Sequence, residues 1–359
     1  MRLQAVACRL ALASVFAALA AAQVPGFYPI VGGLPLDSGL ALGFGYRHPY
    51  LLHGRSEIHV RAIGSTKSYE HLDVRLYVPR SDALFFGEAG VRYRNYPEED
   101  FWGLGPKSPE HLRSTFRMED MDTTGGVGIS PWWFVQTGIR GGFLNVNTGP
   151  GKDEDRPSIE ELFGTADAPA LDRQPDFWHY GAFLQLDYRD EAHDPRRGGF
   201  YSLEWTRFRD DAAGRYDFSR WNVDVRQFFP GIQRGSTVAA RASAAFSRRN
   251  PGHRVPFWMQ PTAGGGNDLR GYLQYRFRDE NMFAANLEHR WRVHELVQVV
   301  AFVDAGNVFP TPGDFALKGM RGSAGIGGRL KLGNLLIIGI DMAWSPEGLR
   351  FWYRGSQIF

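Results

Sequence analysis

The feature that most restricts the fold of this 359-residue chain is an alternation of apolar and polar side chains with a period of two residues. In the segment 178–189, Trp, Tyr, Ala and Leu occupy one face, while glycine, glutamine and charged residues occupy most of the other. The segments 39–47, 201–207, 283–293 and 335–344 follow the same pattern. Because successive side chains of a strand point to opposite faces, the pattern predicts an all-β chain of amphipathic strands.

The length of these strands and the placement of aromatic residues distinguish a membrane barrel from a soluble β-sandwich. The strands are about 9–12 residues long, which matches the roughly 9–11 residues of a tilted membrane-spanning strand. Tryptophans stand near strand ends, where interface girdles form: Trp132, Trp133, Trp178, Trp205, Trp291, Trp344 and Trp352. Backbone groups in lipid must pair within the protein, so we expect a single transmembrane antiparallel β-barrel.

We predict about sixteen strands, an even number as in single-chain bacterial barrels. They are expected to begin near residues 26, 39, 55, 68, 83, 113, 133, 178, 198, 217, 235, 282, 297, 321, 335 and 348. Long connections are predicted at 97–112, 148–177, 250–281 and 310–320, all at one end of the barrel. Short turns are expected at the other end, at 131–132, 231–234, 294–296 and 333–334. Long outer loops and short periplasmic turns are typical of bacterial outer-membrane proteins.

The first 22 residues have the pattern of a secretory signal peptide. Arg2 and Arg9 precede an apolar stretch that ends in three alanines before Gln23, and this stretch is too short to span a bilayer as a helix. The domain predicted for 23–359 then lacks the single cysteine, Cys8, so no disulfide or cysteine metal site is expected. Export without disulfides favours a bacterial envelope over a eukaryotic secreted domain. Together with the barrel pattern, the signal peptide predicts the outer membrane of a Gram-negative bacterium. The net charge of +2 gives no reason to expect nucleic-acid binding.

The stretch GGGNDLRGYLQYRF, at 264–277, is too rich in glycine for a helix and too polar for a buried strand. A phosphate-binding loop would need Lys-Ser or Lys-Thr after the glycines and a following helix, and neither is present. GGGNDLRGY instead resembles the sixth outer loop of the BamA/TamA-type bacterial surface antigen family of outer-membrane assembly and translocation barrels. The family tetrad corresponds to Leu269-Arg270-Gly271-Tyr272. ANLEHR (285–290), FVDAGNVF (302–309), LDYRDEAHDPRRGGFYSLE (186–204) and YPEEDFWGLGPKS (96–108) resemble further family segments in the same order.

The resemblance implies that this outer loop folds into the barrel lumen and that Arg270 binds Glu288 and Asp304 on the inner wall. An arginine between two carboxylates makes charge-assisted hydrogen bonds. Glycines at 264, 265, 266 and 271 let the backbone turn back close to the wall, so the loop motif comprises Gly264, Gly265, Gly266, Leu269, Gly271 and Tyr272. The alternative is a flexible, solvated extracellular loop. The resemblance also implies that Phe359 is a C-terminal assembly signal.

Other residues suggest further sites only weakly. Five residues, Asp187, Asp190, Glu191, His193 and Asp194, could suggest a metal site, but their position between strands favours a solvated turn without metal. No spacing assembles a nucleophile with a base, so neither enzymatic activity nor a cofactor is expected.

Two functions remain. Family members usually carry periplasmic POTRA modules ahead of the barrel, and we expect a short member without them. It is expected to insert or translocate proteins through a lateral seam between the strands at about 26–34 and 348–359, where Pro25 and Pro29 weaken pairing. The alternative is a passive pore or a barrel that organises or transports lipid without protein clients. The expected partners are outer-membrane lipids, nascent outer-membrane proteins as clients, and envelope chaperones during its own assembly.

Overall fold

The computed structural model describes residues 25–35, 38–51, 56–78, 84–212, 214–332, 335–354 and 357–359. The predicted signal peptide and the predicted turn at 333–334 lie outside these ranges. Within them, no helix is both long and apolar enough to cross a bilayer.

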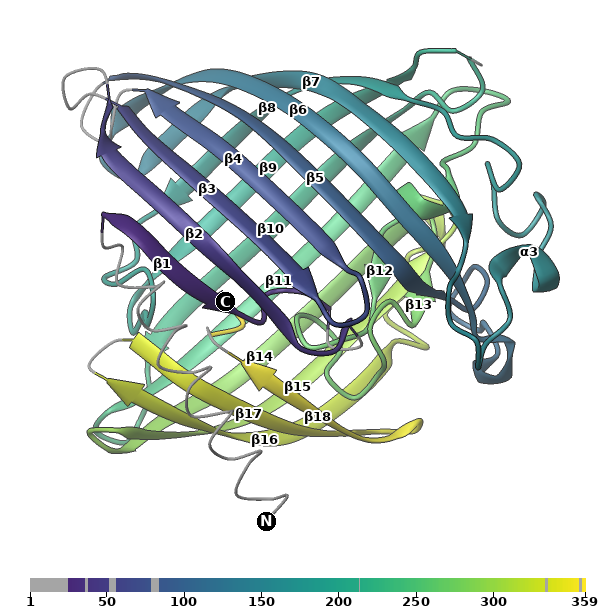
Figure 1. The fold of residues 1–359 in the computed structure, drawn as a ribbon. Coiled ribbons are helices and arrows are strands. Elements are labelled where there is room, and N and C mark those ends of the chain that lie inside the picture. The colour runs from purple at the N-terminus through teal and green to yellow at the C-terminus, as the bar shows by residue number, and fades with distance from the viewer. Residues whose placement is uncertain are drawn as a thin grey trace.

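A single antiparallel sheet of sixteen strands curves round into a barrel (Figure 1). Each strand pairs with the next in the chain, except that β11 pairs with β14 because β12 and β13 form a separate hairpin inside the barrel. The first half of the sheet comprises β1 (Gly26–Val31), β2 (Ala41–Tyr50), β3 (Ser56–Ser65), β4 (Glu70–Val78), β5 (Phe85–Phe101), β6 (Ser114–Trp132), β7 (Val135–Pro150) and β8 (Phe177–Asp187). The second half comprises β9 (Gly198–Asp210), β10 (Phe218–Pro230), β11 (Ser236–Arg249), β14 (Asn281–His294), β15 (Val297–Phe309), β16 (Arg321–Leu332), β17 (Leu335–Ser345) and β18 (Gly348–Arg354).

The remaining elements are short and lie in the connections. The inner hairpin is formed by β12 (Thr262–Ala263) and β13 (Phe277–Arg278). Single helical turns are η2 (Glu110–Leu112), α3 (Ile159–Leu162), η3 (Phe257–Met259) and η4 (Pro312–Asp314). Long connections at 102–113, 151–176, 250–280 and 310–320 gather at one end, and the opposite end has short turns such as 133–134 and 295–296.

The predicted all-β fold and strand number are confirmed, and every strand begins within two residues of its predicted start. The predicted lengths are wrong for some strands. β5, β6 and β7 have 17, 19 and 16 residues, because their ends pack against loop residues in an aromatic cluster that includes Phe101, Phe116 and Phe257. The end strands are shorter than expected, with 6 residues in β1 and 7 in β18.

The apolar faces of the strands point outward. In β15, Val297, Val299 and Val303 are exposed, whereas Gln298 and Asp304 are buried inside. Such an exposed apolar surface is unfavourable in water and is typical of a lipid-facing belt. Most of the girdle tryptophans are exposed at this surface: Trp132, Trp133, Trp178, Trp291 and Trp344. The girdle prediction is wrong for Trp352, which points inward and is only 7% exposed.

A charge placed on the outer face should therefore act differently from one placed inside. Leu203 is an outward residue near the middle of β9, and Leu203→Arg should destabilise the folded barrel by about 2–4 kcal/mol because lipid cannot solvate the guanidinium. Unfolding in urea, followed by tryptophan fluorescence in liposomes, measures the change.

The matched control is Ser202→Arg on the neighbouring inward position. Ser202 lies directly opposite Asp224 of β10, so an arginine there meets a carboxylate. Equal destabilisation by the two variants would contradict the assignment of the faces.

Candidate functional site

The barrel interior is occupied by the connection between β11 and β14, residues 250–280, which we call the lumen loop (Figure 1). Leu269 and Tyr272 of this loop have no exposed surface and pack with Ala263, Phe277 and Val308 of β15. The predicted inward fold of this loop is confirmed, and a flexible, solvated loop is inconsistent with this burial.

Arg270 lies at the centre of the loop and is fully buried. Its Nε and Nη2 atoms donate to the two oxygens of Asp304 at 2.9 and 2.6 Å, and Nη1 donates to Oε1 of Glu288 at 2.5 Å. The guanidinium carbon lies 3.3 Å from the centre of the Phe302 ring, so the charge is also stacked on an aromatic face. We call Arg270, Glu288 and Asp304 the arginine clasp.

The electrostatics of the clasp follow from burial and pairing. Burial acts to lower the pKa of Arg270, but the hydrogen bonds to Asp304 and the charge of Glu288 raise it above its usual value, so the guanidinium stays charged. Asp268 closes the turn of the loop, and its carboxylate accepts from the backbone nitrogens of Gly264 and Leu269 at 3.0 and 2.6 Å. Burial raises the pKa of Asp268 to about 7.

Further charges on the wall extend the clasp. Glu288 is shared with Arg290 of the same strand, whose Nε lies 2.7 Å from Oε2. A third carboxylate, Asp341 of β17, lies 3.6 Å from Arg270 and pairs with Arg329 of β16 at 2.6 Å and with Arg354 of β18. Each of these buried cations therefore faces a carboxylate, as burial of a charge requires.

The glycines of the motif allow the loop backbone to approach the wall. Gly264 and Gly265 have φ values of 121° and 109°, a conformation that side chains rarely adopt. A Cβ atom on Gly266 would lie 3.0 Å from the Trp352 ring, and one on Gly271 would lie 2.6 Å from the Cβ atoms of Ser323 and Ser345. These positions explain why the motif contains glycine there.

The same loop segment holds the last strand of the sheet. The indole Nε1 of Trp352 donates to the carbonyl oxygen of Arg270 at 2.6 Å, and Arg354 donates to the carbonyl of Gly266. Ser345 of β17 donates to the carbonyl of Gly271 at 2.7 Å. The sequence reading missed these contacts, although Trp352 is on the same face of its strand as Arg350 and Arg354, which was a visible sign that it points inward.

Two further arginines fasten the loop to the β17–β18 turn, to the β5–β6 connection and to β5, and the sequence reading missed them too. Arg276 donates to Glu347 at 2.9 Å and to the hydroxyl of Ser108 at 2.9 Å. Arg278 donates to Glu99 of β5 at 3.0 Å. Both lie in the quoted stretch or directly after it, so their sequence position near Arg270 was the available indication.

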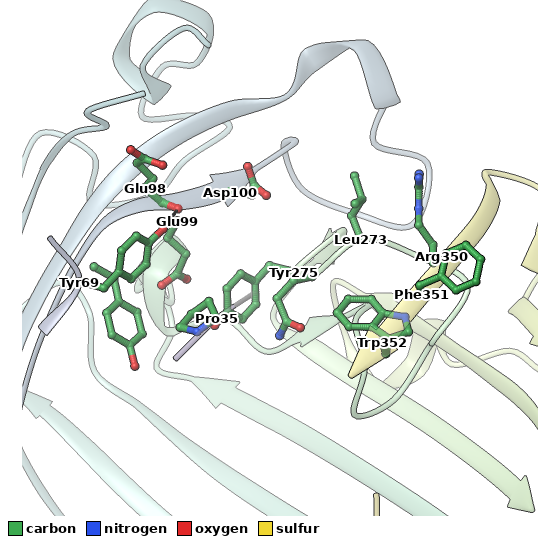
Figure 2. A pocket seen from close by; sticks show the side chains of 12 residues that line it. Pro35, Tyr69, Glu98, Glu99, Asp100, Leu273, Tyr275, Arg350, Phe351 and Trp352 are labelled. Atoms are coloured by element: carbon green, nitrogen blue, oxygen red, sulfur yellow. Dashed lines mark hydrogen bonds between the residues drawn. The ribbon is translucent and has the colours of Figure 1, made fainter. Parts of the chain in front are cut away.

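A cavity of about 180 Å³ lies between β18 and the lumen loop (Figure 2). Arg350, Phe351 and Trp352 border it on one side, and Tyr275 projects into it from the loop. Its far side is formed by Pro35 after β1, by Tyr69, and by residues 96 and 98–100 of β5. The cavity thus joins the region following the first strand with the last strand.

The remaining predicted residues are dispersed. Asp194 is 4% exposed and pairs with Arg292 at 2.8 Å and with Lys331, so the prediction of a solvated turn is wrong for this residue. The turn between β8 and β9 is thereby tied to β14 and β16. No group of metal-binding side chains occurs among the described residues. Phe359 is buried inside the barrel, 5.0 Å from the guanidinium of Arg290.

Comparison with known proteins agrees with this architecture. The Omp85 superfamily domain matches residues 170–348. The fold is similar to BamA from Haemophilus ducreyi lacking POTRA domains 1-3, with a TM-score of 0.67, 14% identity, and coverage of 92% of this chain and 69% of that one.

Two CdiB structures are also similar. CdiB from Escherichia coli has a TM-score of 0.62, 13% identity, and coverage of 91% of this chain and 61% of that one. CdiB from Acinetobacter baumannii has a TM-score of 0.56, 13% identity, and coverage of 91% and 58%. This chain therefore spans less than two thirds of either CdiB chain, and at these identities the likeness concerns the fold. No curated protein matches the sequence.

Removing Arg270 alone should destabilise the barrel more than removing Arg270 together with the charge of Asp304. Arg270→Met leaves the buried carboxylate of Asp304 without a cation, whereas Glu288 keeps Arg290 and Asp341 keeps Arg329. The change should cost about 3–5 kcal/mol of unfolding free energy. Adding Asp304→Asn should restore part of the loss, because the amide introduced by this change carries no charge. Urea unfolding in liposomes compares the two variants. Arg249→Met is the control, since Arg249 pairs with Glu280 but has a 45% exposed side chain. A double variant less stable than the single one would contradict this account.

The close approach of the loop backbone to the barrel wall at Gly271 gives a further prediction. Gly271→Ala places a methyl group against Ser323 and Ser345 and should displace the lumen loop at a cost of about 1–3 kcal/mol. Displacement would expose Arg276 and Arg278, which are nearly fully buried, so trypsin should cut the loop faster. Gly164→Ala, in open space in another loop, should leave the digestion unchanged. Equal protection in both variants would show that the loop does not need this glycine.

Proposed function

Because the chain belongs to the Omp85 superfamily, we propose that it inserts or translocates proteins at the outer membrane through a lateral seam between β1 and β18. The observation that supports this proposal most directly is the contact between the clasp and the end strand, in which Trp352 of β18 donates to the carbonyl oxygen of Arg270. The lumen loop thereby holds the β18 side of the proposed seam in place.

The end strands are suited to opening. β1 pairs with β2 over 6 residues and β18 pairs with β17 over 7, whereas the neighbouring pairs are longer. Pro29 in β1 has no N–H to donate to a ladder. An exposed strand edge is a template on which another chain can add a strand. A client strand added to β18 would pass beside the cavity lined by Tyr275 and Trp352.

The partners follow from this mechanism. Clients are unfolded outer-membrane proteins, whose strands supply unpaired backbone groups to the seam. The lipid-facing belt contacts outer-membrane lipids throughout. Phe359 as an assembly signal and envelope chaperones as helpers of the barrel's own folding remain predictions from the sequence. No step requires a cofactor or a catalytic group, since strand exchange makes and breaks only hydrogen bonds.

A second candidate function is organisation or transport of lipid without protein clients. It is favoured by a groove of about 570 Å³ on the outer face of β6–β9. Outward-facing Gly125 and Gly141 lie opposite each other at its base, and Tyr180 and Trp205 border it. A groove on a lipid-facing surface, lined by glycine, aliphatic and aromatic residues, is suited to an acyl chain.

Folding of a small client barrel in liposomes separates the two functions. The protein without its first 22 residues is reconstituted, a urea-unfolded small outer-membrane barrel is added, and its folding is followed by heat-modifiable gel mobility. Wild type should fold the client about tenfold faster than empty liposomes do. Arg270→Ala should lose this acceleration, because the clasp no longer positions β18.

The matched control is Arg249→Ala, which removes an arginine at the rim and should keep the acceleration. Folding no faster than in empty liposomes would overturn insertion and leave lipid transport, measured next by the rate at which a fluorescent phospholipid changes leaflet.

A further inference from the structure

The last described residues, Gln357–Phe359, lie inside the barrel and not in the sheet, and we call them the tail. Phe359 is 4% exposed and packs against Phe228 of β10 and Ala239 of β11, with Ile358 beside them. Phe228 and Ala239 lie directly opposite each other in the sheet, so they form one continuous apolar patch on the inner wall.

Arg290 also contacts the tail. Its Nη2 atom donates to the backbone oxygen of Phe359 at 3.0 Å, and its guanidinium carbon lies 5.0 Å from the Phe359 ring and 5.7 Å from the Phe228 ring. The residue is 1% exposed, and its Nη1 atom has no hydrogen-bond partner among the described residues. A buried guanidinium with an unused donor can bind a further oxygen ligand, so the tail does not exhaust this site.

Polar contacts hold the tail on its other side. The amide nitrogen of Gln357 donates to Gln298 of β15 at 2.9 Å and to Asp194 at 3.4 Å. Asp194 belongs to the turn between β8 and β9, and it also pairs with Arg292 of β14. The tail therefore contacts the turn between β8 and β9 and the wall strands β10, β11, β14 and β15.

We propose that Phe228, Ala239 and Arg290 form a binding site for an aromatic residue with an adjacent carbonyl or carboxylate oxygen, and that the tail is its exchangeable occupant. The tail makes these contacts through three residues only, so its contact surface is small compared with that between two paired strands of the barrel. The site is preformed on wall strands, since Arg290 is fixed through Glu288 and the patch belongs to β10 and β11.

Occupancy of this site by the tail restrains β18. β18 ends at Arg354, so the tail holds that end of the strand while Trp352 and Arg354 are held by the lumen loop. The two anchors also share a carboxylate, because Glu288 accepts from both Arg270 and Arg290. Release of the tail frees one end of β18 and leaves the clasp arginine paired, so it loosens the strand without unfolding the loop.

The first test measures access to the site. Ala239→Cys in a Cys8→Ser background gives a single thiol beneath Phe359, and its alkylation by a small maleimide reports whether the site is covered. Phe359→Ala should speed alkylation by about tenfold or more, and Phe359→Tyr should keep it slow, because it retains the ring. Acetyl-Gln-Ile-Phe added to the Phe359→Ala protein should slow alkylation again. Equal rates in all tail variants, or no protection by the peptide, would overturn the proposal.

A second measurement needs no change in the tail and so does not depend on the folding of a variant. Excess acetyl-Gln-Ile-Phe should displace the tail from the unmodified protein and speed hydrogen exchange in Gly348–Arg354, while exchange in Val297–Phe309 stays the same. Acetyl-Gln-Ile-Ala is the control peptide and should have no effect. Unchanged exchange in β18 at saturating peptide would show that the tail is a fixed structural element.

Discussion

The interior of this barrel depends on one fully buried guanidinium, that of Arg270. Such a charge is tolerated only where carboxylates surround it, and here they come from β14, β15 and β17. The loop that contains the arginine must therefore enter the lumen, and the wall strands must present acidic side chains inward. The outward apolar faces and the inward charges are two results of one alternation.

The clasp makes the two sides of the sheet unequal. β18 is held from within by the lumen loop through Trp352 and Arg354, and the tail beyond it is bound at Arg290. β1 is a strand of 6 residues that pairs with β2 and contains a proline. In the seam that we propose, β18 is therefore the side restrained from within, and β1 is a strand with 6 paired residues.

Much of this site could be predicted from the sequence, on two different grounds. The strand starts and the inward direction of Glu288 and Asp304 follow from alternation, which is a local property. The pairing of these carboxylates with Arg270 came from resemblance to a family motif. Alternation could not predict this pairing, because the side chains that meet inside a barrel are many residues apart. The path of the loop between the strands is not fixed by the alternation either. Trp352 was misassigned to the girdle for another reason. Tryptophan is typical of a membrane interface, but the alternation places Trp352 on the inward face with Arg350 and Arg354.

The sequence by itself determined the class of fold, the number of strands and the face on which each side chain lies, since a period of two residues fixes all of these locally. Only the tertiary structure decided which inward side chains meet. A curved sheet brings distant strands to face one common interior, and four features depend on it. These are Asp341 as a third carboxylate near the clasp, the fastening of β18 by the loop, the pairing of Asp194 with Lys331, and the site of Phe359. The curvature of the barrel and the path of the lumen loop determine which inward side chains come into contact. No short stretch of the sequence determines either of them.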